Sequence, residues 1–243
     1  MTRDVVYGRR PAREVLRAGR RPVLELLATE RALAAEAWLR QAPGLRVQVR
    51  SEAALAEAAG TRDHQGVVAL CEPYRYADAY EIAGGERALV VCLDQVTDPH
   101  NLGAVCRSAE GAGASGLVVP EHSAARVTAA VCRASAGAVE HLPVAVVVNL
   151  ARYLGEIKRP DLWVWAAAAD ARTPVWSADL SGAVAIVFGA EGRGLRPGVR
   201  RACDDAFSIP LAGEVESLNV SVAAGVALFE AARQRRGIMS ADG

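Results

Sequence analysis

The sequence predicts an α/β protein built mainly on a parallel β-sheet. Apolar runs of strand length recur along the chain, and stretches with helical spacing separate them. Strands that are apolar along their whole length and alternate with helices indicate a sheet covered on both faces. The 243 residues are enough for one large domain or two smaller ones.

The first seventy residues predict a small α/β module. Ser51 is a typical N-cap, and Gly60 is suited to end the same helix. The expected helices cover residues 10–19, 30–40 and 51–59, and the expected strands cover residues 22–29, 45–49 and 66–72. Regular alternation of this kind predicts a first domain over residues 1–72.

Residues 73–87 interrupt the alternation. This stretch contains a proline, three tyrosines and a pair of glycines, a composition that is typical of a linker. The apolar runs after it predict strands at 88–94, 116–120, 144–148, 162–168, 183–189 and 207–210. A long last helix is expected over 218–236, and one stripe of it carries Leu218, Val222, Val226 and Phe229. We therefore expect a second domain over residues 88–243.

The charge is balanced overall but not locally. The 28 basic and 28 acidic residues cancel, which excludes a uniformly basic nucleic-acid-binding surface. Residues 1–21 hold seven arginines against Asp4 and Glu14, a net charge of +5. This stretch predicts an RNA-binding patch, and a solvated arginine-rich helix is the alternative.

Metal, disulfide and membrane classes are not indicated. The five cysteines stand singly, so reduced thiols that act as small apolar side chains are expected rather than a metal site or a disulfide framework. Apolar runs stay well below the ~20 residues that span a bilayer. The N-terminus has no apolar signal core, and we expect a cytoplasmic protein.

The first candidate functional loop follows the strand at 88–94. Ligands of open α/β sheets bind beyond the carboxyl ends of the strands. Asp98 and Asn101 are turn and helix-cap residues, and Gly103 lets another backbone come close. Arg107 lies one or two turns inside the next helix. A capped helix with a surface arginine is the alternative.

A second loop, residues 187–197, follows the strand at 183–189. Gly189, Gly192 and Gly194 surround Glu191 and expose backbone groups to a closely approaching ligand. No Gly-Lys-Ser/Thr follows, and the spacing is G-x-x-G-x-G, so the loop is neither a Walker A loop nor a dinucleotide fingerprint.

One true G-x-G-x-x-G occurs at Gly111, Gly113 and Gly116. It ends a predicted helix and precedes a strand, which is the reverse of the context that dinucleotide binding needs. We interpret it as a helix stop, and this disfavours a dinucleotide-dependent oxidoreductase.

The third segment covers residues 207–223. Ser217 and Asn219 open the last helix, where free N–H groups and the helix dipole favour an anionic or carboxylate group. An ordinary N-cap at Ser217 is the alternative.

The three segments in this order resemble the signature motifs of the SpoU (TrmH-like) RNA ribose 2′-O-methyltransferases, a branch of the SPOUT superfamily. The matching stretches are DPHNLGAVCRSA, FGAEGRGL and IPLAGEVESLNVSVAAGVALFE, and the resemblance covers residues 88–236. Residues 1–72, from VYGRRPAREVL onward, are similar to the N-terminal domain of the bacterial 23S rRNA (guanosine-2′-O-)methyltransferases of this family.

The resemblance implies a fold and a cofactor. It implies a SPOUT domain with a deep trefoil knot and a small L30e-like N-terminal domain that holds RNA. It also implies S-adenosylmethionine, bound near the stretch that follows residues 162–168. The implied cofactor-binding residues are Gly189, Glu191, Ile209, Leu211, Leu218 and Asn219.

The resemblance further implies methyl transfer to a ribose 2′-oxygen. The implied catalytic residues are Asn101, Arg107, Glu191, Ser217 and Asn219. Because a neutral arginine is costly, Arg107 is expected to stabilise the developing alkoxide, and proton abstraction by it stays open. Glu191 is expected to hold Arg107 or to hydrogen-bond the cofactor. His100 is a candidate base, with a plain turn histidine as the alternative.

The implied partners are RNA, most of all 23S rRNA, and a second copy of the chain. No membrane and no metal are expected. The same chemistry on another rRNA or tRNA nucleotide, including antibiotic-resistance methylation of rRNA, is an alternative. A catalytically inactive RNA-binding protein is another.

Overall fold

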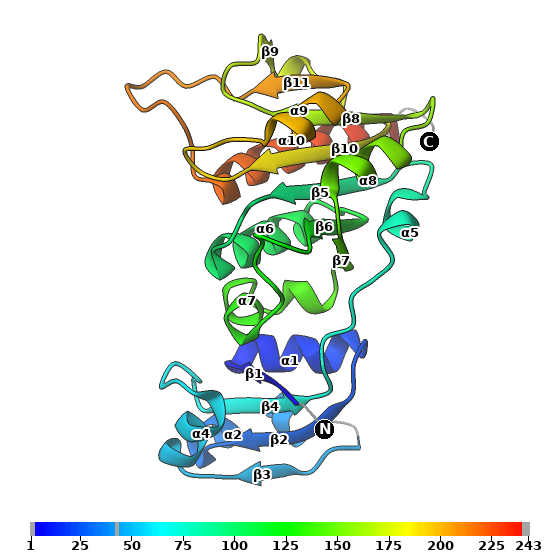
Figure 1. The fold of residues 1–243 in the computed structure, drawn as a ribbon. Coiled ribbons are helices and arrows are strands. Elements are labelled where there is room, and N and C mark those ends of the chain that lie inside the picture. Colours follow the sequence, from blue (N-terminus) through cyan, green and yellow to red (C-terminus); the bar gives the residue numbers. More distant parts are fainter. Residues whose placement is uncertain (1–2, 42–43, 240–243) are drawn as a thin grey trace. The chain divides into compact units, whose positions relative to one another are not determined.

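The computed structural model describes residues 3–41 and 44–239 (Figure 1). The chain divides into two compact units. The first contains the residues up to Arg75 together with Arg126–His141, and the second contains Tyr76–Ala125 and the residues from Leu142 onward. The division differs from the predicted one, because a segment expected in the second domain belongs to the first unit.

The first unit is built on a four-stranded mixed sheet with the order β1-β4-β2-β3. These strands are β1 (Asp4–Tyr7), β2 (Val23–Ala28), β3 (Val47–Val49) and β4 (Val67–Cys71). Its helices are α1 (Arg9–Ala18), α2 (Glu30–Ala35), α3 (Ala37–Arg40) and α4 (Glu52–Ala59). Strand β4 is antiparallel to β1 and β2, whereas β2 and β3 are parallel.

Local sequence signals account for most of these boundaries. The Ser51 hydroxyl accepts a hydrogen bond from the Ala54 amide, and Gly60 ends α4 in the left-handed region, as predicted. The single helix expected over 30–40 is wrong, because the backbone is extended at Glu36. There the carboxylate accepts hydrogen bonds from Arg9 and Trp38. The short strand β1 had no predicted counterpart.

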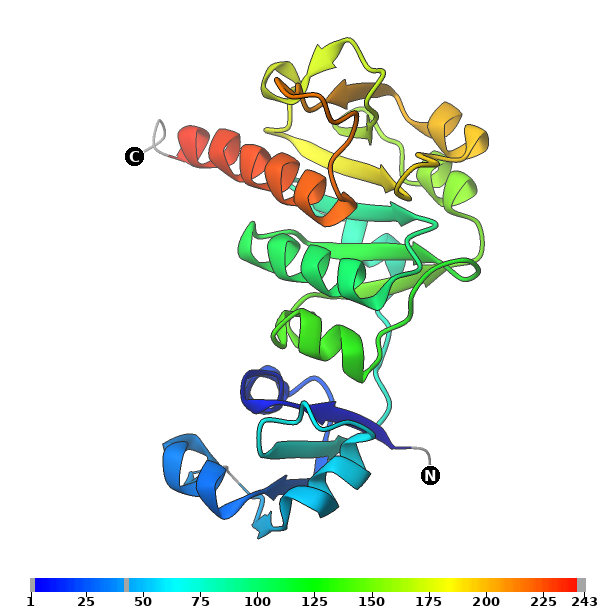
Figure 2. The ribbon, with the colours of Figure 1, turned by 90° about the vertical axis from the view of Figure 1, so that its left-hand side faces the viewer.

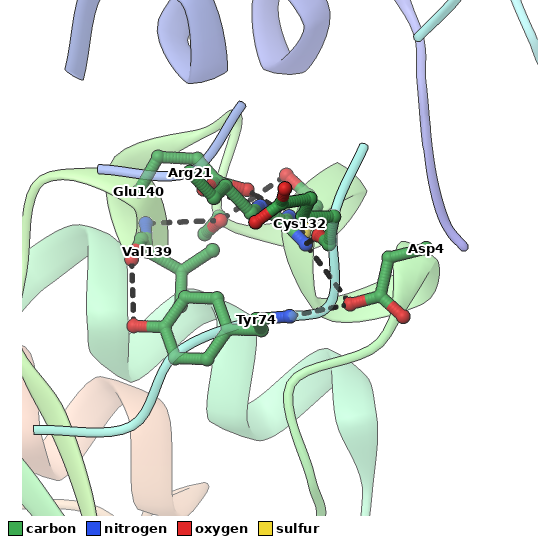
Figure 3. A network of polar contacts seen from close by, with 8 residues as sticks. Asp4, Arg21, Tyr74, Cys132, Val139 and Glu140 are labelled. Carbon is green, nitrogen blue, oxygen red and sulfur yellow. Dashed lines mark hydrogen bonds and ion pairs between the residues drawn. The ribbon is translucent and has the colours of Figure 1, made fainter. Parts of the chain in front are cut away.

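The segment Arg126–His141 carries α7 (Ala129–Ala134) and the 3-10 turn η1 (Ala138–Glu140). Arg21 and Glu140, which are 3% and 1% exposed, form an ion pair there. Arg21 also donates to Asp4, and the Tyr74 hydroxyl donates to the Val139 carbonyl (Figure 3). This buried network explains why the segment belongs to the first unit.

The second unit is built on a seven-stranded parallel sheet with the order β7-β6-β5-β10-β8-β11-β9, as the apolar runs predict. Its longer strands are β5 (Leu89–Asp94), β6 (Gly116–Pro120), β7 (Val144–Val147), β8 (Leu162–Ala167) and β10 (Ala183–Gly189). The two short ones are β9 (Thr173–Pro174) and β11 (Asp205–Ser208).

Helices cover both faces of this sheet. The helices are α5 (Ala79–Ala83), α6 (Pro99–Gly111), α8 (Leu150–Glu156), α9 (Pro197–Ala202) and α10 (Val220–Met239). Figure 2 shows α6 and α10 side by side on one face, while α5, α8 and α9 join the core on the other. The short helix α5 lies within the predicted linker. Helix α6 ends at Gly111, so the G-x-G-x-x-G stretch is the helix stop that was expected.

Helix α10 turns part of its predicted stripe outward. Val222 and Phe229 are 51% and 52% exposed, and the buried side chains are mostly alanines. Among residues 220–236 of this helix, the buried residues are Val220, Ala224, Ala227, Leu228 and Ala231. Small side chains suit the close packing of α10 on α6, and the larger apolar residues remain on the surface.

Four of the five cysteines are buried, and none forms a disulfide. Burial raises the pKa of Cys71 and of Cys106 to about 12, which favours the thiol form of both. Over residues 3–41 and 44–239, no helix combines the length and apolar character needed to cross a membrane.

Candidate functional site

Strands β5 and β10 place two of the predicted loops next to each other. They are parallel neighbours in register, with Gly189 opposite Asp94, the last residue of each strand. The loop of residues 95–98 and the loop of residues 190–196 therefore leave the sheet at the same edge. This is the edge at which open α/β sheets bind ligands.

Gly189 is required by the path of its own loop. A Cβ at this position would lie 2.2 Å from the Gly194 carbonyl carbon and 2.4 Å from its oxygen. The loop closes on itself through a hydrogen bond from the Gly194 amide to the Ala190 carbonyl, at 2.9 Å. Gly192 and Gly194 both have positive φ angles, of 71° and 64°. Glycine is thus needed for close approach at one position and for backbone conformation at two.

A buried carboxylate anchors the far end of this loop. Asp94 is fully buried and accepts hydrogen bonds from the Arg196 amide (2.9 Å) and the Arg196 Nε (2.8 Å). Neither residue is among the site residues predicted from the sequence. The available signal was the carboxylate itself, because a charged residue that ends a fully apolar strand needs a partner.

Asn101, Glu191 and Asn219 come together from three separate segments. Asn101 Nδ2 donates to Glu191 Oε1 at 3.0 Å, and Asn219 Nδ2 donates to the same oxygen and to Asn101 Oδ1. The Asn219 Oδ1 accepts from the Ser221 amide, which makes Asn219 a cap of α10. These three residues, called the amide–carboxylate cluster below, join all three predicted loops.

A cavity of about 530 Å³ lies beside this cluster. Of the six residues expected to bind the cofactor, five line it. They are Gly189, Glu191, Ile209, Leu211 and Leu218, and the sixth, Asn219, belongs to the cluster. Residues 168–170, which follow β8, line the cavity as well.

Two further predicted residues lie differently from their expected places. Ser217 lines the cavity but does not cap α10, which begins at Val220 behind Asn219.

Arg107 is exposed on α6 and has no ion pair within the described part of the chain. Glu191 therefore does not hold Arg107 within one chain, because its hydrogen bonds come from Asn101 and Asn219. His100 is exposed in the first turn of α6, where its amide donates to Asp98.

No group of three or more histidine, cysteine, aspartate or glutamate residues is placed to hold a metal ion, as far as residues 3–41 and 44–239 are concerned.

Comparisons with known proteins agree with this architecture. The SpoU rRNA Methylase family matches residues 88–229, and the family of RNA 2′-O ribose methyltransferase substrate-binding domains matches residues 5–77. The 23S rRNA (guanosine-2′-O-)-methyltransferase RlmB of Xylella fastidiosa is 46% identical over 198 residues, covering 79% of each chain. The enzyme of the same name from Vibrio cholerae is 43% identical, again over 79% of each chain.

Solved structures are similar over nearly the whole chain. The SpoU methyltransferase AviRb of Streptomyces viridochromogenes, in complex with AdoMet, is 29% identical with a TM-score of 0.81, and 96% of this chain and 91% of that one are covered. A structure described as an RNA 2′-O ribose methyltransferase is 33% identical with a TM-score of 0.82, covering 96% and 89%. The chain belongs to the SpoU rRNA methylase family.

Proposed function

We propose that this protein transfers a methyl group from S-adenosylmethionine to the ribose 2′-oxygen of a guanosine in 23S rRNA. The observation that carries the proposal is the meeting of three loops, distant in sequence, around one cavity and the amide–carboxylate cluster. Relatives that are 41% to 46% identical bear the name of this activity.

The lining of the cavity suits the cofactor in its chemistry. Gly189, Gly192 and Gly194 line it without side chains, and Ile209 and Leu218 supply apolar surfaces for an adenine ring. A structural neighbour is described in complex with AdoMet. We expect Gly189, Ile209, Leu211 and Leu218 to hold the adenosine part, with Glu191 and Asn219 at the reacting end.

When bound, S-adenosylmethionine supplies an activated methyl group on a positively charged sulfur. The protein then has to position two reactants and make a weakly acidic hydroxyl nucleophilic. The amide–carboxylate cluster orients the ribose, since its carboxylate and amide oxygens accept hydrogen bonds. Arg107 stabilises negative charge as it develops on the 2′-oxygen. Ser217, exposed at the cavity, is placed to hydrogen-bond the ribose or the cofactor.

Arg107 performs this role from a second copy of the chain. It is exposed on α6, four residues before Gly111, and the Phe229 ring lies beside Gly111. Residues spaced by four share one face of a helix, so Arg107 lies on the same surface as the exposed Phe229. Val222 and Phe229, each about half exposed and seven residues apart on α10, form an apolar patch, and exposed apolar patches mark interaction surfaces. We therefore place the interface of a homodimer here, with Arg107 reaching the partner's cavity.

The first unit holds the RNA in this proposal. Its sequence matches the substrate-binding family, and the +5 stretch supplies the charge. Only part of that stretch is available to RNA, because Arg21 is buried against Glu140 and Arg3 and Arg9 form ion pairs. We assign the phosphate contacts to the exposed Arg10 and Arg13.

The finer features of the fold belong to the same proposal. We propose a deep trefoil knot around the cavity and an L30e-like first domain, and the resemblance to the family supports both. Residues 1–72 would act as the RNA-binding domain and 88–243 as the methyltransferase domain. A ribosomal RNA substrate would place the reaction in the cytoplasm.

A map of ribose methylation tests the function. Ribosomal and transfer RNA from cells with and without the gene is compared nucleotide by nucleotide. We expect one guanosine of 23S rRNA to lose its methyl group in the absence of the gene. Loss at a tRNA position or at a different rRNA nucleotide would replace the substrate, and an unchanged map would support an inactive RNA-binding protein.

A further inference from the structure

A second cavity, of about 560 Å³, also borders the amide–carboxylate cluster. Its lining shares Ala190, Glu191, Arg193 and Val220 with the cofactor cavity, so one wall separates the two. Asn101 of the cluster also lines it. The remaining lining residues are Gln95, Val96, Thr97, Asp98 and Ser123.

Two of these residues have a strained backbone. Gln95 has a φ angle of 61° and Ser123 one of 59°, and only four non-glycine residues of the described chain have positive φ. Such conformations are costly for residues with a Cβ and gather at functional sites. The loop that carries Ser123 is fastened to the loop that carries Gln95, because the Ala125 amide donates to the Val96 carbonyl at 2.9 Å. The surrounding structure therefore holds both residues at the cavity.

Three polar side chains of this lining are unused in the described part of the chain. Within the described residues, the side chains of Gln95, Thr97 and Ser123 have no hydrogen-bond partner. A carboxamide offers an acceptor and two donors, and each hydroxyl offers one donor and an acceptor. Convergent polar groups at a cavity of this size are typical of a site that recognises a small polar ligand.

We propose that this cavity takes the base of the target nucleotide, turned out of the RNA, and that Gln95, Thr97 and Ser123 read its Watson–Crick edge. The inference rests on the proposed methyl transfer, because the shared wall then puts the ribose of that nucleotide beside the cofactor cavity. Enzymes that do chemistry on a base turn it out of the stack and read its Watson–Crick edge in a pocket, and the same geometry would present the ribose of the nucleotide. Guanine presents one acceptor and two adjacent donor groups on that edge, and a carboxamide flanked by hydroxyls can satisfy all of them.

Glycine substitutions test this without endangering the fold. Gln95→Gly and Ser123→Gly remove the polar groups and suit the positive φ, so both variants should be at least as stable as the parent. Thr97→Val removes the third polar group, a hydroxyl, at nearly constant volume. Ala136→Gly is the matched control, because Ala136 also has a positive φ, 53°, but lies in the first unit. The assays are melting temperature, calorimetry with S-adenosylmethionine, and kcat/KM on an RNA fragment that contains the mapped nucleotide.

We expect Gln95→Gly to lower kcat/KM about 10- to 100-fold, the discrimination typical of a lost two-bond contact to a base. The affinity for S-adenosylmethionine should not change. The parent should prefer guanosine to inosine, which lacks the 2-amino group, at the target position. This preference should shrink in Gln95→Gly, Thr97→Val and Ser123→Gly and stay intact in Ala136→Gly.

Unchanged kcat/KM and an unchanged guanosine preference in all three variants would overturn the inference. A loss of cofactor affinity equal to the loss of activity would overturn it as well, because the residues would then support the cofactor cavity. If the parent methylates no RNA at all, the proposed function itself fails, which is a separate result.

Discussion

Arg21 and Glu140 form a buried ion pair across 119 residues of sequence. The Arg21 Nε donates to Glu140 Oε2 at 3.1 Å, and a second bond joins Nη2 to Oε1 (Figure 3). Burial lowers the pKa of Arg21, but the hydrogen bonds and charge of Glu140 outweigh it, so that pKa is raised above its ordinary value. The pair therefore stays charged and joins the first 75 residues to the segment Arg126–His141.

Breaking this pair on one side should destabilise the first unit strongly. Arg21→Met leaves the Glu140 carboxylate buried without its partner, which typically costs about 3–5 kcal/mol. Urea unfolding followed by circular dichroism measures the effect. Arg75→Ala removes a surface pair in the same unit and should cost about 1 kcal/mol or less. Equal effects of the two variants would show that the buried pair has no special role.

A second contact with the segment Arg126–His141, between Glu14 and His141, makes the stability of the first unit depend on pH. Burial raises the pKa of Glu14, but hydrogen bonds and charges from His141 and Arg17 outweigh it, so the pKa lies below its ordinary value of 4.5. The resulting stabilisation is complete above pH 4.5 and is lost as the pH falls through the lowered pKa. Unfolding free energies measured from about pH 6 to 3 should fall less steeply in Glu14→Gln than in the parent.

Glu57→Gln on the exposed side of α4 is the control for this measurement. It should keep the slope of the parent. A Glu14→Gln variant with the parent's slope would mean that other carboxylates set the acid sensitivity.

Most of the fold could be predicted from the sequence because its signals are local. Each long strand of the parallel sheet is a run of apolar residues, and turn residues mark where the runs end. The docking of Arg126–His141 could not be predicted, because it depends on a pairing between Arg21 and Glu140 that no local pattern contains. The outward orientation of Val222 and Phe229 was also missed, since the alanines that fill the buried face of α10 carry little hydrophobic signal.

The candidate site was predictable only in part. The loops follow from the positions of glycines and cap residues after strands, and five of the six residues that the resemblance named for the cofactor line the cofactor cavity. The bond between Asp94 and Arg196 was missed because it spans 102 residues. The sequence did not predict that Arg107 lies away from Glu191, because a motif gives the spacing of residues along the chain and not the direction of a side chain.

Gly189→Ala should weaken the binding of S-adenosylmethionine. Its new methyl group would meet the Gly194 backbone at 2.2 Å, and backbone cannot yield as a flexible side chain can. We expect the loop to shift and the dissociation constant from calorimetry to rise about tenfold or more. Gly198→Ala, at a helical position where an added Cβ would meet no atom within 4 Å, should bind as the parent does. Unchanged affinity in Gly189→Ala would contradict the assignment of this loop to the cofactor.

Arg107→Ala should abolish methyl transfer and leave cofactor binding intact. Loss of one group that stabilises transition-state charge typically costs about 100- to 1,000-fold in kcat. Arg107→Lys should recover little of the rate, because a lysine lacks the planar guanidinium. Single-turnover methylation and calorimetry separate the two effects. Normal turnover by the alanine variant would remove Arg107 from the mechanism.

Mixing two inactive variants tests where Arg107 acts. One subunit carries Arg107→Ala and keeps its cofactor cavity, while the other carries Gly189→Val and keeps Arg107. If Arg107 reaches the partner's cavity, the mixed dimer contains one complete site, formed by the intact cavity of the first subunit and the arginine of the second. Co-expression with two different affinity tags isolates that dimer, and its activity should approach half that of the parent dimer. If Arg107 serves its own subunit, neither cavity is complete and the mixed dimer stays as inactive as its components.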